Sequence, residues 1–251
     1  MADSIPLGVQ SYCFRGFQDG ASVAAKVKEI GLSRIELCVR HADFWTPAAF
    51  PAVLEAYRAA GVEAVSIGVN PVTGDEAKDR SLFEFCRAAG ARHMSVDFAP
   101  DDLAARLRTA EKLSEEYGVL CGIHVHGGRH WLGSGQALRW VFSQCSKRIG
   151  LCLDTAWAMD AGEDPVKMIG EFGDRLHLLH LKDFIFDRAG RPDDVVVGTG
   201  NLDLQALQKA LRQSGFRGLA ILEYEGDVND PVPALKECVN KLLAGMTDLK
   251  A

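Results

Sequence analysis

One rhythm repeats along this chain of 251 residues: a short apolar run, a few polar or glycine residues, and then a longer amphipathic segment. The apolar runs predict strands at 5–12, 33–38, 63–68, 92–97, 119–125, 149–154, 175–181 and 218–223. The amphipathic segments predict helices near 21–30, 47–60, 75–89, 101–117, 134–146, 164–172, 203–214 and 231–244. Strands that alternate with crossover helices must run parallel, so this rhythm predicts a parallel sheet covered by helices.

Eight strand–helix units in about 250 residues fit a closed (β/α)8 TIM barrel. We therefore expect an α/β protein in which residues 1–251 form a single barrel domain. The alternative is an open, doubly wound sheet, but that fold favours a glycine-rich turn after the first strand, and residues 10–16 offer none. Asp164 and Pro165 predict the start of one helix, and Gly90 and Gly215 predict the ends of two others.

Composition excludes several classes of protein. The chain is 47% hydrophobic and 25% charged, as ordinary globular proteins are. It lacks an apolar run of membrane-spanning length and a signal-peptide pattern, so we expect no membrane partner and a cytoplasmic location. A net charge of −6 argues against nucleic acid as a partner, and seven scattered cysteines read as reduced thiols. The oligomeric state stays open, and a homo-oligomer is compatible with the sequence.

Polar residues gather at the carboxyl ends of the predicted strands, where a TIM barrel places its active site. They are Glu36, Asp97, His124, His126, Asp154, His180, Lys182, Asp183 and Glu223. Any one of them could cap a helix or meet solvent, but so many strand ends together favour a site. The tightest subset is His124, Asp154, His180 and Glu223, whose strands are neighbours, so their side chains can converge on one ion. Two imidazoles and two carboxylates favour Mn²⁺, Co²⁺, Fe²⁺ or Zn²⁺ over Mg²⁺.

Motifs along nearly the whole chain resemble the xylose isomerase-like sugar phosphate isomerase/epimerase superfamily. They are VQSYCFR (9–15), RIEL (34–37), LDTAW (153–157), AGEDP (161–165), HLKD (180–183), GTGNLD (198–203) and ILE (221–223). The resemblance implies a TIM barrel that binds one divalent cation, with Mn²⁺ as the expected ion, usually through Glu, Asp, His and Glu. It places Asp154, His180 and Glu223 on metal positions.

The fifth strand departs from the superfamily pattern. It normally supplies a glutamate, often within Glu-x-His, and this chain has His124-Val-His126 instead. On the resemblance, His124 is a substituted metal ligand, His126 faces the substrate, and His130 lies outside the metal ligands. Many relatives also have a histidine three residues after the strand-six aspartate, where this chain has Trp157.

The resemblance implies isomerisation or epimerisation of a small sugar, keto-sugar or cyclitol. A base would remove a proton next to a carbonyl, and the metal would stabilise the resulting enediolate. Glu223 is the expected base, with His126 or Lys182 as its partner. Lys182 could instead contact an oxyanion or form a purely structural pair with Glu223. Because His124 replaces one of the two metal-bound glutamates, the site also suits a β-elimination, as in the superfamily's inosose dehydratases and keto-sugar lyases.

The substrate is expected to contact Trp157 and Trp45, since aromatic faces match the C–H groups of a sugar ring. Glu36 and Asp97 are expected either to contact the substrate or to support the metal ligands from behind. Packing beneath loops is the alternative for the tryptophans. The DNA-repair relative endonuclease IV would need many more histidines, including one at the position of Trp157. A barrel that binds a sugar without catalysis also stays open, because His124 breaks the ligand pattern.

Overall fold

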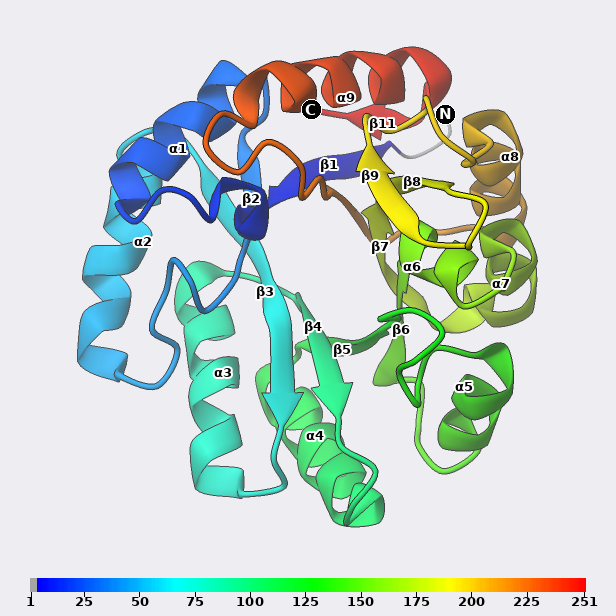
Figure 1. The fold of residues 1–251 in the computed structure, drawn as a ribbon. Coiled ribbons are helices and arrows are strands. Elements are labelled where there is room, and N and C mark those ends of the chain that lie inside the picture. The colour runs from blue at the N-terminus through cyan, green and yellow to red at the C-terminus, as the bar shows by residue number, and fades with distance from the viewer. Residues whose placement is uncertain (1–3) are drawn as a thin grey trace.

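The computed structural model describes residues 4–251, within which eight parallel strands close into a barrel with helices around the outside (Figure 1). The barrel strands are β1 (Ile5–Gln10), β2 (Arg34–Leu37), β3 (Glu63–Val72), β4 (His93–Phe98), β5 (Leu120–His124), β6 (Ile149–Asp154), β7 (Leu176–Leu181) and β10 (Leu219–Leu222). Pairing of β10 with β1 closes the ring, and every neighbouring pair in it is parallel. The predicted (β/α)8 barrel is confirmed.

Helices connect successive strands, as the amphipathic segments predict. They are α1 (Gly20–Glu29), α2 (Phe50–Arg58), α3 (Glu76–Ala89), α4 (Leu103–Tyr117), α5 (Gly135–Phe142), α6 (Thr155–Asp160), α7 (Pro165–Phe172), α8 (Leu204–Ser214) and α9 (Val232–Gly245). Asp164 caps α7 by accepting hydrogen bonds from the backbone N–H groups of Val166 and Lys167. No helix within residues 4–251 combines the length and the apolar composition that crossing a membrane requires.

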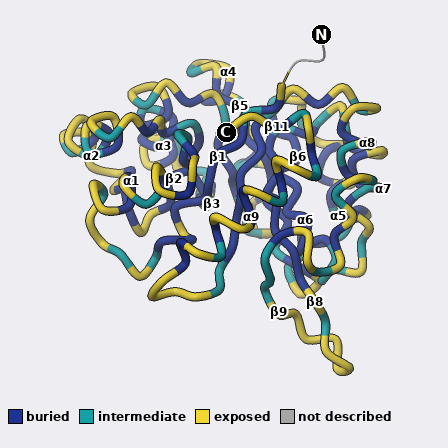
Figure 2. The backbone as a smooth tube through the Cα atoms, turned by 90° about the horizontal axis from the view of Figure 1, so that it is seen from above, coloured by how far each residue is buried: buried dark blue, intermediate teal, exposed yellow. Residues whose placement is uncertain are grey.

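Three features of the fold were not predicted from the sequence. The short helix α6 starts directly at the end of β6, because the Asp154 carboxylate accepts hydrogen bonds from the first backbone N–H groups of α6. An antiparallel hairpin of β8 (Asp183–Phe186) and β9 (Pro192–Val195) follows β7, and its exposed tip projects from the molecule (Figure 2). A short strand β11 (Leu249–Lys250) pairs with the start of β1.

The inside of the barrel contains two stacked layers. Cys152, Leu178, Leu219 and Ile221 form a small buried apolar cluster that is separate from the main core between sheet and helices. Residues two positions apart on a strand share a face, so the next inward positions of β6, β7 and β10 are Asp154, His180 and Glu223. The apolar layer therefore supports a polar layer directly above it, at the carboxyl ends of the strands.

On β5 the lower position is Gly122, two residues before His124. A Cβ atom on Gly122 would lie 3.0 Å from both the Cβ and the backbone nitrogen of Cys152. Glycine thus allows the close approach of β5 to β6, which are paired from Cys121 to His124.

Candidate metal centre and active site

The structure brings His124, Asp154, His180 and Glu223 together at the carboxyl end of the barrel. Each residue offers one ligand atom, and these four atoms all lie within 4.8 Å of one another. His180 Nδ1 lies 2.8 Å from Glu223 Oε2 and 3.1 Å from His124 Nε2, while His124 Nε2 lies 3.7 Å from Asp154 Oδ2. Four strand ends thus direct two nitrogens and two oxygens toward one place.

The two carboxylate oxygens of Asp154 have different surroundings. Oδ1 accepts hydrogen bonds from the backbone N–H groups of Ala156 and Trp157, both at 2.9 Å. Oδ2 is buried, faces the two histidines and has no hydrogen-bond partner among residues 4–251. A buried carboxylate oxygen without a donor is costly unless a cation compensates it. The four residues therefore fit a divalent metal ion.

Burial and neighbouring charges shift the pKa values of these four groups in different directions. Burial raises the pKa of Asp154 to about 7, although Lys182 acts in the opposite direction. Burial would also raise the pKa of Glu223, but Lys182 and the hydrogen bond with His180 lower it to about 2. Burial and the neighbouring His126 and His180 lower the pKa of His124 well below its usual value. Glu223 is therefore a carboxylate and His124 a neutral imidazole, which is the form that binds metals.

Lys182 lies behind Glu223 and is only 1% exposed. Its ammonium group forms a close ion pair with Glu225 and lies 3.5 Å from Asp194 Oδ2 and 3.8 Å from Glu223 Oε1. Burial would lower the pKa of Lys182, but Glu223, Asp154 and Glu225 raise it above its usual value. Lys182 therefore stays protonated among these carboxylates. Its charge explains the low pKa of Glu223, whereas a group that keeps its proton is a poor proton donor.

Glu36 lies inside the barrel, fully buried, on the far side of His180 from the other three ligands. Its carboxylate accepts hydrogen bonds from Gln10 Nε2 (2.6 Å), Ser66 Oγ (2.5 Å) and Ser95 Oγ (3.0 Å). His180 Nε2 lies 3.1 Å from Glu36 Oε1, although the ring is not aligned for a hydrogen bond. The side chain thus faces His180, and it is not among the residues that line the cavity above the cluster.

A second group lies beside the four ligands and consists of Asp97, His126 and His130. Their ligand atoms also lie within 4.8 Å of one another, and the rings of His124 and His126 are 4.2 Å apart. His130 Nε2 lies 3.4 Å from Asp97 Oδ1, and His130 Nδ1 accepts a hydrogen bond from the Leu132 N–H. When one ring nitrogen of a histidine binds a metal, the other usually donates a hydrogen bond. Nδ1 of His130 accepts one instead, so Nε2 carries the proton and is better placed to pair with Asp97 than to bind a metal. His126 Nδ1 is buried and lacks a partner within the described residues.

A cavity of about 660 Å³ opens above the ligands, a volume within the range of small-molecule sites. Its lining is Gln10, Tyr12, Cys38, Val39, Arg40, Gly68, Val69, His124, His126, Trp157, Glu223 and Glu225. Trp157 thus lies where a sugar-facing residue is expected. Trp45, whose ring packs edge-on against Phe44, and Asp97 are not among the lining residues.

The sequence analysis did not identify several residues that lie at or near this cavity. Tyr12 and Arg40 follow the ends of β1 and β2, and Glu225 comes two positions after Glu223, so the spacing of these three offered a signal. Asp194 reaches Lys182 from β9 of the hairpin, and no periodicity in the sequence indicates that contact.

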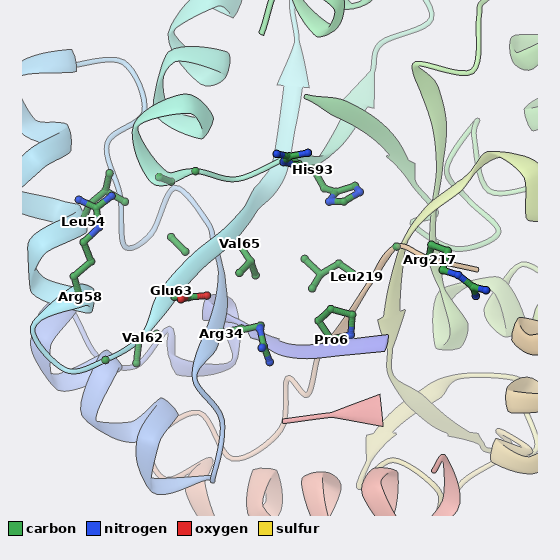
Figure 3. Close-up of a pocket in the computed structure, with 16 residues that line it drawn as sticks. Pro6, Arg34, Leu54, Arg58, Val62, Glu63, Val65, His93, Arg217 and Leu219 are labelled. Atoms are coloured by element: carbon green, nitrogen blue, oxygen red, sulfur yellow. The ribbon is translucent and has the colours of Figure 1, made fainter. Parts of the chain in front are cut away.

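A larger cavity of about 740 Å³ lies at the opposite end of the barrel, where β2, β3 and β4 begin (Figure 3). Arg34, Arg58, Arg92 and Arg217 line it. Helices of a TIM barrel end at this face, and Arg58 donates a hydrogen bond to the Ala88 carbonyl in the last turn of α3. Basic side chains stabilise helix C-termini in this way, so Arg58 has a structural role here. The ligand cluster points to the smaller cavity as the site.

Comparison with known proteins agrees with this geometry. Residues 24–242 match the family model described as xylose isomerase-like TIM barrel. The chain belongs to this family. An inosose dehydratase from Lacticaseibacillus casei is 26% identical over 145 residues, which are 51% of this chain and 49% of that protein. The chain spans less than half the length of the curated relatives that it matches.

Solved structures show the same barrel fold. The 3-keto-D-glucoside 4-epimerase YcjR from E. coli has a TM-score of 0.73 and 16% identity, with 95% of this chain and 98% of that chain covered. The IOLI protein, solved with a bound zinc atom, has a TM-score of 0.71 and 14% identity, with 96% and 98% covered. At these identities the likeness establishes the fold alone.

Proposed function

We propose that this protein is a divalent-metal-dependent isomerase or epimerase that acts on a small sugar, keto-sugar or cyclitol. The observation that carries the proposal is the cluster of His124, Asp154, His180 and Glu223, with the unpartnered Asp154 Oδ2 facing the histidines at the base of a cavity. Mn²⁺ is the expected ion, and Co²⁺, Fe²⁺ and Zn²⁺ suit the same donors. When bound, the ion would stabilise negative charge that develops on substrate oxygens.

Glu223 is the base in this proposal. Its carboxylate lines the cavity, and Lys182 together with His180 keeps it ionised. It can therefore accept a proton from the carbon next to a carbonyl. Burial lowers the pKa of His126, whose neutral ring lines the same cavity and can return or donate a proton from another direction. Lys182 stabilises the charge on Glu223 instead of transferring a proton itself.

Glu36 acts as a positioning residue for His180. Its contact with Nε2 leaves Nδ1, which is next to His124 and Glu223, as the atom that faces the metal. A carboxylate behind a ligating histidine fixes the ring and raises its basicity.

A metal titration of Asp154→Asn tests the proposal. The asparagine oxygen can still cap α6, so the variant should fold, but one anionic ligand is lost. We expect stoichiometric Mn²⁺ binding by the native protein and none by the variant in calorimetry. Native protein incubated in D₂O with keto-sugars and keto-inositols should then exchange protons next to the carbonyl. Equal metal binding by both proteins, or exchange that survives chelation, would remove the basis of the proposal.

A metal-dependent dehydratase is the second candidate. It is favoured by the asymmetry of the site, since Glu223 offers a carboxylate base while His124 and His126 offer imidazoles. A base on one side and an acid on the other suit loss of a hydroxyl next to the abstracted proton. The same NMR assay separates the candidates, because elimination forms an alkene or a new ketone, whereas epimerisation inverts a centre without loss of water.

A further inference from the structure

The larger cavity, at the amino end of the barrel, has no part in the proposed reaction. Its volume is about 740 Å³, and side chains from the starts of β1, β2, β3, β4 and β10 surround it (Figure 3). Val65 and Leu219 line it, and both belong to the apolar layer inside the barrel or pack against it. That layer separates the cavity from the ligand cluster above. A molecule bound here would therefore not touch the reacting atoms.

Arginines supply most of the charged side chains around this cavity. Its lining includes Arg34, Arg58, Arg92, Arg217 and one carboxylate, that of Glu63. Arg217 already makes other contacts, among them a 3.1 Å hydrogen bond from Nη1 to the Phe216 carbonyl. The other three arginines are therefore the ones to consider as partners for a ligand.

Support of a helix end explains only one of these three arginines. Arg58 Nη2 donates a 2.9 Å hydrogen bond to the Ala88 carbonyl in the last turn of α3. Arg34 makes a long contact of 3.4 Å from Nη1 to the carbonyl of Lys250, which belongs to β11 and not to a helix. The Arg92 guanidinium has no hydrogen-bond or ion-pair partner within residues 4–251. A guanidinium group has five N–H donors, so most donors of Arg34 and all those of Arg92 remain for a ligand.

Positive charge remains here after the neighbouring groups are counted. Glu63 contributes one negative charge, and the C-terminal ends of α2 and α3 add about half a charge each. The Lys250 ammonium cancels the carboxylate of Ala251 beside it. Burial and the neighbouring His177 lower the pKa of His93 to about 4, so this ring is neutral at pH 7. Among the described residues, three guanidinium groups thus face about two negative charges, in a chain whose net charge is −6.

Much of the remaining lining is aliphatic, and the residues that supply it are Pro6, Leu54, Val62, Ala64, Val65 and Leu219. Such a wall packs against an apolar or flat organic group, while guanidinium groups bind phosphate through paired hydrogen bonds. The cavity volume also falls within the range of small-molecule sites. We infer that this cavity binds an organic phosphate, with the phosphate groups at Arg34, Arg58 and Arg92 and the organic group on the aliphatic wall. The inference goes beyond the proposed function and does not depend on it.

Backbone amide shifts of the ¹⁵N-labelled protein, followed by NMR as ADP, pyrophosphate or adenosine is added, test the inference. We expect saturable shifts with both phosphates at Gly61, Gly90 and Gly218, which line this cavity, and none at Gly68, which lines the upper one. ADP should bind several-fold more tightly than pyrophosphate, because only ADP carries an organic group for the aliphatic wall. Added salt should weaken its binding.

Adenosine lacks the phosphate groups and should bind about tenfold more weakly than ADP, or worse. Adenosine that binds as tightly as ADP would overturn the inference, because the arginines would then contribute nothing. Absence of shifts at these glycines with both phosphates up to about 10 mM, or shifts at Gly68 alone, would overturn it as well.

Three variants identify the groups that bind. The double variant Arg34→Gln/Arg92→Gln should bind ADP about tenfold more weakly or worse, and Arg92→Gln alone several-fold more weakly. Arg188→Gln is the matched control, because Arg188 is also exposed but lies at the tip of the β8–β9 hairpin, so its ADP affinity should be native (Figure 2). Urea unfolding checks that each variant folds, and Arg92→Gln should keep native stability since it loses no partner within the described chain. Native ADP affinity in a folded Arg92→Gln would overturn the inference, whereas the metal titration tests the proposed function at the other end of the barrel.

Discussion

Glu36 places a carboxylate in the centre of the barrel, where charge is expensive unless it is compensated. Gln10, Ser66 and Ser95 supply three hydrogen bonds, but all three donors are neutral. The nearest group that can carry or share positive charge is His180. At the scale of one residue, the buried Glu36 and the neighbouring His180 therefore depend on each other.

Glu36→Gln should weaken metal binding about 10- to 100-fold, because the amide carries no charge to orient and polarise His180. Calorimetric titration with Mn²⁺ measures the change. Asp79→Asn is the matched control, since Asp79 is also a buried carboxylate but accepts its hydrogen bonds from Thr73 and Gly74 before α3. It should lose stability and keep its metal affinity. Native affinity in Glu36→Gln would rule out a positioning role.

Metal affinity should fall as the pH drops below about 7. Burial, opposed by Lys182, raises the pKa of Asp154 to about 7, so below that pH the carboxyl carries a proton that must leave before a cation binds. Although burial alone would lower the pKa of His180, Cys152, Glu36 and Glu223 raise it, so His180 adds to the same trend. The dissociation constant should rise up to about tenfold per pH unit for each proton released. Calorimetry in two buffers of different ionisation enthalpy counts those protons; a count of zero would contradict the assignment.

At the scale of elements, Asp183 joins two of the sequence motifs. It is the first residue of β8 and is fully buried, and it accepts hydrogen bonds from the backbone N–H groups of Gly198, Gly200 and Leu202, each at 2.9 Å. The HLKD and GTGNLD segments thus meet through one side chain. A Cβ on Gly200 would lie 2.6 Å from Asp183 Oδ1, which explains the glycine.

Asp183→Ala should destabilise the fold by about 3 kcal/mol or more, because three backbone donors lose a charged acceptor in a buried place. Urea unfolding measures the loss. Asp203→Ala is a suitable comparison, since the exposed Asp203 caps α8 by accepting from two backbone N–H groups. Removal of such a cap costs about 1 kcal/mol. Similar losses in the two variants would show that Asp183 is only an ordinary cap.

Elements with a regular apolar alternation could be predicted from the sequence. Elements and positions that depend on individual contacts could not. His124, Asp154, His180 and Glu223 could be found because each ends an apolar run and the barrel rule places such ends together. The hairpin could not be predicted, since β9 reads Pro-Asp-Asp-Val and has no apolar alternation. For Glu36 the sequence left two alternatives, contact with the substrate or support of a ligand, because alternation indicates which face a side chain takes but not which residue lies beside it.

At the scale of the whole molecule, metal should stabilise the fold. Asp154 and Glu223 are buried close together, and an ion that binds only the folded chain shifts unfolding by mass action. At a thousandfold excess over the dissociation constant the gain is about 4 kcal/mol, which corresponds to an increase in Tm of the order of 10 °C. Calorimetric scans with Mn²⁺ and with a chelator measure it. Identical midpoints, or the same shift in Asp154→Asn, would contradict a metal at this site.

The fold follows from the alternation of strands and helices along the whole chain, because eight such units leave few arrangements open. The family follows from the sequence motifs instead, and the family model confirms it. That residues 1–251 form one domain stays a prediction, as does the role of each site residue.

The two layers inside the barrel have a consequence for how such a protein can change over time. Cys152, Leu178, Leu219 and Ile221 hold the strands together from below, while each ligand above them is supplied by a different strand–helix unit. A substitution at one strand end, such as position 124, can therefore change one side chain of the polar layer without disturbing the packing that keeps the barrel closed. Natural selection, or a protein designer, can therefore change the polar layer one strand end at a time while the apolar layer below it stays the same.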